Sequence, residues 1–504
     1  MKKLKKNNGK YSPKHCWKMV ISKMIFDYVN NHKNIFPESL KWDELLYIIS
    51  KMEYKVLSKK YIDLADDYIP FPSAELKSYK SDYKKYLDFL LRIGVLDKEN
   101  YSTTQQRCTK YKFEHKKIYS LGYRTFDIKN LDIKNLEIKR SIKQPKKDYL
   151  FQGYKDKDLG HLTKWFNDDL QFDENKFLEL LPSILTKKDK MYNENDDDSV
   201  TRRKYLRIQS YHRSAGELLH KNFRMSRNNN SDNRFHTNLT NLSKKLRQFV
   251  KYKGETLHSW DIKNSQPFFI SILIEGLKNN NRNIIRNINK VYGNNNNGII
   301  SKISSTFLSD KGFQEEFETL KKWTLQGVFY DEVIGIYNLQ KGKFDEYAVK
   351  VFNVMTNKTF DKGFKCKRDA SKALTLRLLY SPGKKEDKHY KAFKSRFPKV
   401  CDFFIFLKNY SGGEDSHKKF PKLLQHIEAD CVIDNVTKKI AKKHPHAPIF
   451  TVHDSIVTTE EYIDEFQDLM YNYISEYTNG LIPKLSKECW CADDDITDSY
   501  LEAA

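Results

Sequence analysis

Long apolar runs are missing from this sequence. No stretch approaches the roughly 20 apolar residues that a membrane-spanning helix needs. The first residues, MKKLKKNNGKYSPKH, carry positive charge with no apolar segment behind it, which is not the pattern of a signal peptide. The sequence therefore predicts a soluble, cytoplasmic protein that has no membrane partner.

Paired cysteines are also missing. The seven cysteines are scattered, none forms a CxxC pair, and Cys489-Trp490-Cys491 has no second ligand pair nearby, which argues against a zinc site. An odd, dispersed set of thiols is typical of a reducing compartment, in agreement with a cytoplasmic location.

Basic residues are abundant instead. Lys and Arg number 90 against 66 Asp and Glu, which gives a formal net charge of +24. Such an excess favours polyanionic partners, chiefly nucleic acid. An AT-rich genome also enriches lysine and asparagine, so the charge permits a nucleic-acid partner without establishing one. The 31 tyrosines and 31 phenylalanines suit both a folded core and base stacking.

Residues 1–126 predict a small DNA-binding domain. Apolar residues recur at helical spacing over 16–31, 42–52 and 79–92, and residues 107–113 alternate as a strand does. Helices followed by a β-hairpin are typical of a winged-helix domain, which would bind a specific DNA sequence. The alternative is a generic α+β domain with solvated lysines.

The spacing of apolar residues in the rest of the chain predicts mainly helices. Residues 127–147 are repetitive and charged and predict a linker or an exposed helix, and the asparagine-rich segment 279–298 predicts an insertion loop. Helices are predicted over 159–185, 202–223, 313–339, 344–360, 365–379 and 423–441.

Two aspartates lie at the ends of predicted strands. In TVHDSIVT, the runs 449–452 and 456–458 predict a hairpin whose turn displays Asp454. In SWDIKNSQPFF, the strand 256–262 carries Asp261, and Asn264-Ser265 offers an N-cap for the next helix. A two-metal phosphoryl-transfer site needs two such carboxylates, so the hypothesis is a nucleotide polymerase.

A basic helix lies between the two aspartates. In KRDASKALTLRLLYSP, Arg368 and Lys372 are four residues apart and therefore lie on one face, which Leu376 and Tyr380 continue. Alone this is an ordinary amphipathic helix, but between two aspartate motifs it suits the binding of a triphosphate.

Five elements, in this order, resemble the family A DNA polymerases. They are the arginine motif NRFHT (233–237), LRQFV followed by SWDIKNSQPFF (motif A), the helix with Arg368, Lys372 and Tyr380 (motif B), QHIEAD (425–430) and TVHDSIV (motif C). The resemblance implies an α/β (α+β) right-hand fold with a thumb, a palm built on an antiparallel sheet, and helical fingers. It implies a linker and thumb-like region over 127–230 and a polymerase core over 231–504, with fingers at about 278–390.

The resemblance also implies roles for individual residues. Asp261, Asp454 and the backbone carbonyl of Ile262 would hold two Mg²⁺ ions, with Mn²⁺ as an alternative. Arg368 and Lys372 would neutralise the triphosphate, and Tyr380, beside Leu376 and Gln266, would lie under the nascent base pair. His453 would contact the primer terminus, and the duplex would be held by Arg234, Arg247 and Gln425. The alternatives are a buried turn histidine for His453 and a helix-surface amide for Gln425.

Some positions depart from the family pattern. Gln266 stands where the DNA-polymerising members have a glutamate that helps to exclude the ribose 2′-hydroxyl, and Ser455 replaces an acidic residue. Leu376 stands where an aromatic often lies, and Ser381 replaces a glycine. The preference for deoxyribose or ribose therefore stays open.

The leading hypothesis is a DNA polymerase that extends a primer on a template with (d)NTPs and lacks a proofreading exonuclease. The alternatives are an RNA polymerase, a primase or a terminal transferase on the same fold, and a non-catalytic replication initiator. The N-terminal domain suggests a phage, plasmid or mobile-element origin. The oligomeric state stays open.

Overall fold

The computed structural model describes residues 17–57, 68–99, 108–114, 133–138, 157–184, 198–228, 230–293, 297–342, 346–353, 358–382, 388–413 and 415–491. The chain divides into two compact units. Unit 1 comprises 1–153, 171–224 and 242–249, and unit 2 comprises 154–170, 225–241 and 250–504. The units are discontinuous along the chain. The three consecutive domains that the sequence indicates stay a prediction. No helix in the described ranges combines the length and apolarity that crossing a bilayer requires.

The first described element of unit 1 is a strand. β1 (Trp17–Ser22) precedes α1 (Lys23–Asn31) and pairs antiparallel with β5 (Ile133–Ile138). The helix predicted over 16–31 is therefore wrong before Lys23, and the predicted linker over 127–147 contains a strand. Both strands contain β-branched residues, and their pairing satisfies backbone groups that neither could satisfy alone.

The described residues that follow, 33–57, 68–99 and 108–114, form helices and a small sheet. The helices are α2 (Trp42–Val56), α4 (Ser73–Tyr79) and α5 (Tyr83–Arg92). The sheet has the order β2 (Ile69–Pro70), β4 (Lys110–Phe113), β3 (Leu96–Glu99), and all pairs are antiparallel. Helices followed by a hairpin are the element order that the winged-helix prediction requires. Binding of DNA by this domain stays a prediction.

The long helix α10 (Asp198–Leu219) is part of the core of unit 1. Arg213 lies 3.7 Å from Glu53 and donates to the carbonyl of Ser50 at 3.4 Å. Burial raises the pKa of Glu53 to about 7, although the Arg213 charge and the Ser22 backbone N–H lower it. The predicted helix over 159–185 is broken into α7 (Gly160–Thr163), β6 (Leu170–Phe172) and α8 (Glu174–Ile184).

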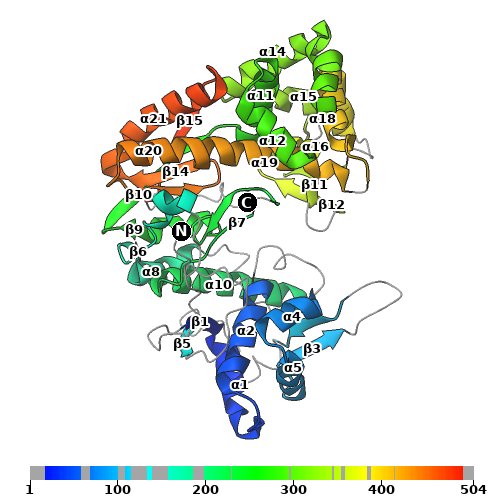
Figure 1. The fold of residues 1–504 in the computed structure, drawn as a ribbon. Coiled ribbons are helices and arrows are strands. Elements are labelled where there is room, and N and C mark those ends of the chain that lie inside the picture. The colour runs from blue at the N-terminus through cyan, green and yellow to red at the C-terminus, as the bar shows by residue number, and fades with distance from the viewer. Residues whose placement is uncertain are drawn as a thin grey trace, which may run out of the picture. The chain divides into compact units, whose positions relative to one another are not determined.

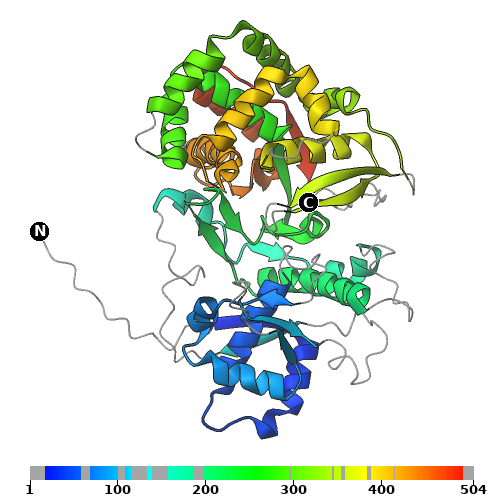
Figure 2. The same cartoon turned by 90° about the vertical axis from the view of Figure 1, so that its right-hand side faces the viewer.

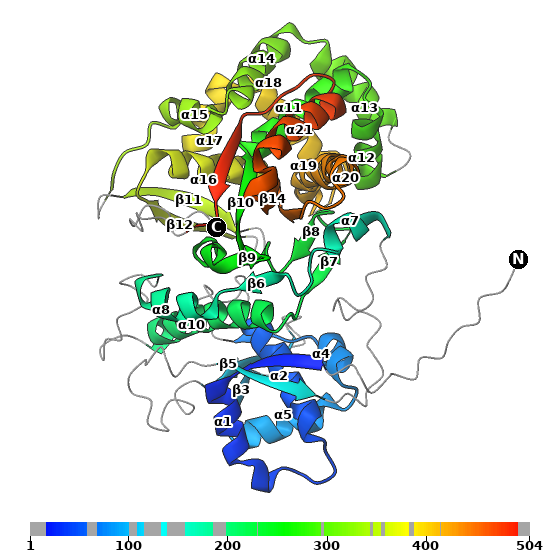
Figure 3. The same cartoon turned by 90° about the vertical axis from the view of Figure 1, so that its left-hand side faces the viewer.

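The sheet of unit 2 is built around β10 (Glu255–Ile262). β14 (Ser455–Thr459) pairs with one side of β10 and β15 (Leu485–Cys489) with the other, as Figures 1 and 3 show. β13 (Phe450–Val452) extends the sheet beyond β14, and β9 (Val250–Tyr252) pairs with the start of β10. Every pairing is antiparallel. The predicted strand 256–262 and the predicted hairpin 449–458 are confirmed.

Helices form most of the other described segments of unit 2. They are α11 (Ser265–Lys278), α12 (Arg282–Tyr292), α13 (Asn297–Ile303), α14 (Lys311–Leu325), α15 (Phe329–Tyr337), α16 (Lys367–Tyr380), α17 (Lys388–Arg396), α18 (Pro398–Asn409), α19 (Lys419–Ala429), α20 (Thr437–Lys443) and α21 (Glu460–Thr478). A π-helical turn (Asp430–Val436) joins α19 to α20.

The asparagine-rich segment is not the predicted loop over 279–298. α12 forms there because Ile284, Ile288 and Val291 recur at helical spacing and are buried. Asn281 caps its first turn, since its side chain accepts from the backbone N–H of Asn283 at 2.9 Å.

The helix predicted over 344–360 is also wrong. The segment is the antiparallel hairpin β11 (Tyr347–Asn353) and β12 (Lys358–Phe364), drawn in yellow in Figure 2. Its burial has a period of two: Tyr347 and Val349 are buried, whereas Ala348 and Lys350 are exposed. Apolar residues at every second position of YAVKVF are the strand signal that the helical interpretation overlooked.

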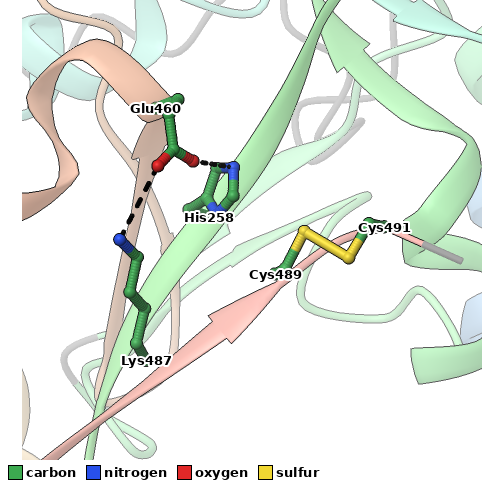
Figure 4. Close-up of a disulfide and its surroundings, with 5 residues drawn as sticks. All are labelled: His258, Glu460, Lys487, Cys489 and Cys491. Atoms are coloured by element: carbon green, nitrogen blue, oxygen red, sulfur yellow. Dashed lines mark ion pairs between the residues drawn. A yellow bond between two sulfur atoms is a disulfide. The ribbon is translucent and has the colours of Figure 1, made fainter. Parts of the chain in front are cut away.

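A disulfide joins Cys489 at the end of β15 to Cys491, with the Cα atoms 5.2 Å apart (Figure 4). The scattered-thiol interpretation is therefore wrong for this pair. Cys108, Cys366, Cys401 and Cys431 are free. Figure 4 also shows Glu460 between His258 of β10 and Lys487 of β15, with its ion pair to Lys487 at 3.8 Å.

Candidate active site

The two predicted metal ligands lie together at one end of the sheet. In the ladder between β10 and β14, Trp260 lies opposite Ile456, so the next residue, Asp261, reaches the turn that contains Asp454. Ser455 Oγ donates to Asp261 Oδ1 at 2.6 Å. His453, at φ 57°, adopts the left-handed conformation that a tight hairpin turn needs. The register and the turn together bring the two carboxylates to one place.

The two carboxyl groups repel each other. Burial and then the charge of Asp454 raise the pKa of Asp261 to about 7, while Ser455 and Lys372 lower it. Burial also raises the pKa of Asp454, while Arg234, Ser265 and Lys372 lower it. Two half-buried carboxylates that resist joint ionisation form a site that a cation would stabilise.

Magnesium fits the donors present. In the described part of the chain no group of three or more His, Cys, Asp or Glu side chains is placed to hold a metal ion. Mg²⁺ in phosphoryl-transfer sites commonly takes one or two carboxylates and completes its shell with water and substrate phosphates. Asp261, Asp454 and the backbone carbonyl of Ile262 offer hard oxygen donors of this kind.

α16 directs one cation toward the carboxylates. Lys372 lowers the pKa of both Asp261 and Asp454. Arg368, one turn earlier, pairs with Asp331 at 3.3 Å, and its guanidinium lies 5.7 Å from the ring centroid of Tyr330. Leu376 is half-buried on the same helix. The predicted stripe is therefore a real face of α16, with Lys372 electrostatically coupled to the aspartates.

Tyr380, the last residue of α16, begins a chain of hydrogen bonds. Its hydroxyl donates to Gln266 Oε1 at 3.0 Å, and Gln266 Nε2 donates to Glu428 Oε2 at 2.9 Å. Glu428 accepts two bonds from Arg234, from Nε at 2.7 Å and from Nη2 at 2.6 Å. The four side chains come from α16, α11, α19 and the segment before β8 (Phe235–Thr237). We call them the Tyr380–Arg234 network.

Charge links this network to the aspartates. Burial raises the pKa of Glu428 to about 7, although Arg234 lowers it, and the charge of Asp454 raises it further. The pKa of Arg234 is lowered by burial but raised more strongly by Glu428, so the guanidinium stays charged. A bidentate arginine–carboxylate pair of this kind fixes the orientation of both side chains and also pairs their charges.

The remaining predicted residues are placed as follows. Gln425 is half-buried on α19, one turn before Glu428. The His453 ring centroid lies 6.2 Å from that of His236, in an edge-to-face arrangement. Arg247 belongs to the 3₁₀ helix Lys244–Phe249 of unit 1, whereas the two aspartates belong to unit 2. The predicted contacts of these three residues with a duplex stay predictions.

Sequence reasoning missed three residues of the site. Glu428 could have been found, because it lies three residues after Gln425 and so shares a helix face with it. Ser455 was noted only as a departure, yet it is the donor that orients Asp261. Glu488 of β15 lies opposite Ser259 in the ladder and raises the pKa of Asp261. No local pattern predicts its proximity, because the pairing joins distant segments.

A buried lysine holds the end of α16. Lys408 of α18 is 2% exposed, and its Nζ donates to the carbonyls of Leu378 at 2.5 Å and Ser381 at 2.9 Å. These carbonyls lie where a helix end leaves its acceptors without backbone partners. Lys408 therefore fixes the end of α16 that carries Tyr380.

We predict that Lys408→Met destabilises the protein by about 1–3 kcal/mol, because two buried carbonyls lose their donor. Urea unfolding measures the change, and hydrogen exchange should increase at 378–381. Burial lowers the pKa of Lys408 to about 7, well below that of an unfolded lysine. The unfolded chain thus binds the extra proton between about pH 7 and 10, so this group makes stability rise with pH there. The variant should not show this rise of stability with pH. A pH profile of stability equal to that of the wild type would contradict the lowered pKa of Lys408.

Comparison with known proteins gives matches among solved structures. No protein-family model matches the sequence, and no curated protein matches it. Among solved structures, the chain is similar to the POL domain of Pol1 from M. smegmatis in complex with DNA primer-template and dNTP, with 13% sequence identity and a TM-score of 0.34. The match covers 62% of this chain and 60% of that chain, which is less than two thirds of its length.

Proposed function

We propose that this protein is a template-directed nucleotidyltransferase, a DNA polymerase that extends a primer 3′-hydroxyl. The observation that carries the proposal is the pair of mutually repelling carboxylates, Asp261 and Asp454, with Lys372 of α16 acting on both. Such a pair is costly for the fold, and transfer of a nucleotidyl group is chemistry that would use it.

Each group of the site has a distinct task in the proposed reaction. Asp261 and Asp454, with the carbonyl of Ile262, would hold divalent cations, which when bound activate a sugar hydroxyl and offset phosphate charge. Lys372 and Arg368 would bind the triphosphate, which requires Arg368 to exchange Asp331 for a phosphate. Ser455 keeps Asp261 in its orientation by donating to Oδ1.

The Tyr380–Arg234 network would form the floor under the new base pair. Tyr380 is held from one side by Gln266, and Gln266 is held by Glu428. In the right-hand arrangement that we propose, the β10 sheet is the palm and the helices from α12 to α16 belong to the fingers. Primer contacts would come from His453, Gln425 and Arg234, and Arg247 would add a duplex contact.

A second candidate is RNA synthesis, in a polymerase or a primase. Gln266 favours it, because an amide replaces the carboxylate expected from the family resemblance at the position that faces the sugar. Against it, Glu428 supplies a carboxylate to the same network at 2.9 Å from the Gln266 amide. We therefore favour deoxynucleotides.

We predict that Gln266→Ala lowers discrimination between dNTP and NTP by about 10- to 100-fold, because Tyr380 loses its partner and the carboxylate of Glu428 is left with one donor fewer. Single-nucleotide incorporation, with all eight nucleotides supplied separately on defined primer-templates, measures the ratio of kcat/KM. Gln467→Ala on α21 is the control. An unchanged ratio would show that sugar selection lies elsewhere.

The same assay tests the proposed function. Primer extension that needs both a template and a divalent cation is the expected result. Extension that ignores the template base would identify a terminal transferase. No incorporation, together with binding to one specific DNA sequence, would favour the non-catalytic initiator.

A further inference from the structure

The β11–β12 hairpin presents an exposed aromatic ring. Phe360 is 49% exposed, although the adjoining part of the hairpin is packed against α16, with Tyr347, Val349 and Phe364 buried. Phe360 lies opposite Val351 in the ladder, on the same face as the buried residues but farther along. We call Val351, Phe352 and Phe360 the hairpin tip.

Two contacts fix the direction of the hairpin along α16. Lys367, at the start of α16, lies over the ring of Tyr347, the first residue of β11, with its Nζ 6.0 Å from the ring centroid. Arg377, in the last turn of α16, donates to the carbonyl of Lys350 at 3.1 Å. β11 therefore runs in the same direction as α16, and the hairpin tip lies toward the end that carries Tyr380.

A third contact ties the tip to α19. The ring of Phe352 lies edge-to-face with His417, at 6.5 Å between centroids, and His417 precedes the start of α19 by two residues. α19 carries Gln425 and Glu428. The hairpin tip thus borders the two helices that frame the Tyr380–Arg234 network, and Figures 1 and 3 show the hairpin beside α16.

The chemistry of the tip suits an unpaired nucleic-acid strand. Between 346–352 and 359–367 the described residues carry four lysines, Lys350, Lys362, Lys365 and Lys367, against two carboxylates, Glu346 and Asp361. Nearby cations that follow a phosphate backbone and an exposed aromatic ring that accepts a base are the two features of single-strand binding surfaces. A double helix would offer the ring no free base face.

We propose that the hairpin tip binds the unpaired template strand just before it enters the active site, by stacking a base on Phe360 while Lys362, on the same face of the hairpin, contacts a phosphate. The inference rests on the proposed function, because the template is what must approach the Tyr380 end of α16. It adds a second nucleic-acid contact that lies outside the five polymerase-like motifs.

Equilibrium binding tests the inference without catalysis. The full chain is titrated, with neither nucleotide nor divalent cation, against one fluorescent duplex that is either blunt or carries a ten-nucleotide 5′ overhang. The wild type should prefer the overhang. Phe360→Ala should reduce that preference by about 5- to 100-fold, the value of one base–aromatic stack. Phe360→Trp should retain the preference, and Lys362→Gln should lower the salt slope of overhang binding by about one.

Ile482→Ala is the matched control, because Ile482 is equally exposed at 49% and lies away from the hairpin in sequence. Equal losses for blunt and overhanging duplexes, or no loss for Phe360→Ala, would overturn the inference. So would a wild-type dimer in solution that Phe360→Ala dissociates, since the tip would then bind a second copy of the chain. Overhang preference without any nucleotide incorporation would instead count against the proposed function alone.

Discussion

Asp261→Asn and Asp454→Asn should each reduce nucleotide incorporation by at least about a thousandfold, which corresponds to about 4 kcal/mol of lost transition-state stabilisation. Each change keeps the shape of the side chain but removes the charge that a divalent cation would neutralise. Because the two carboxylates form one site, the double variant should lose little more than either single variant. Single-turnover primer extension measures the loss.

The same variants should make the protein more stable in the absence of metal. The pKa of Asp261 is raised to about 7 in the fold, against about 3.9 for an unfolded aspartate. Ionisation therefore removes stability as the pH rises from about 4 to 7, and Asp261→Asn removes that penalty. A gain of one to about three kcal/mol is expected at pH 7, whereas added Mg²⁺ should stabilise only the wild type.

Thermal melts with and without Mg²⁺ separate the stability gained by the variants and the stabilisation by Mg²⁺ from non-specific destabilisation. Asp464→Asn is a matched control, since Asp464 is a carboxylate on α21 whose side chain is 83% exposed and pairs with Lys487. It should change neither incorporation nor the response to Mg²⁺. A Mg²⁺-dependent shift that persists in both aspartate variants would place the metal elsewhere.

Glu428→Gln should cost about 3 kcal/mol of stability and most of the activity. The Glu428 side chain is 1% exposed and that of Arg234 is 16% exposed, so the variant leaves a largely buried guanidinium without its counter-charge. Gln266 would at the same time lose its acceptor, and with it the anchor of Tyr380. Urea unfolding and primer extension with the same preparation measure both effects.

A double variant identifies the cause. Arg234→Met combined with Glu428→Leu removes both charges and should recover part of the stability but none of the activity. Recovery of activity as well would mean that the pair serves the fold alone. A loss below about 0.5 kcal/mol for Glu428→Gln would show that the pair is solvated and weak.

Local patterns predicted the strands and helices that carry the site. β10, the β13–β14 hairpin and α16 were predictable because each has a clear periodicity and a polar residue at a turn or on one face. The positions of Asp261, Asp454 and Lys372 follow from those elements. Their mutual coupling needed the ladder register between β10 and β14, which a sequence pattern alone does not fix.

The failures have physical causes of two kinds. The predicted loop at 279–298 and helix at 344–360 were misjudged from composition, since burial of Ile284 and Ile288 and the alternation around Val349 decide those segments. Glu428, Glu488 and Lys408 act through contacts between segments far apart in the chain. Their roles depend on burial and on partners that only tertiary packing brings together.

The discontinuity of unit 1 has a consequence for how the chain is made. α10 supplies Arg213 to the buried Glu53, and the unit ends only at residue 249. At about 5–20 residues per second, a ribosome needs roughly 6–25 s to pass from residue 126 to residue 249. The residues up to 126 therefore emerge well before α10, and Glu53 lacks its Arg213 partner during that time. A chaperone that holds nascent chains would have this interval in which to bind unit 1, before residues 250–504 of unit 2 have been translated.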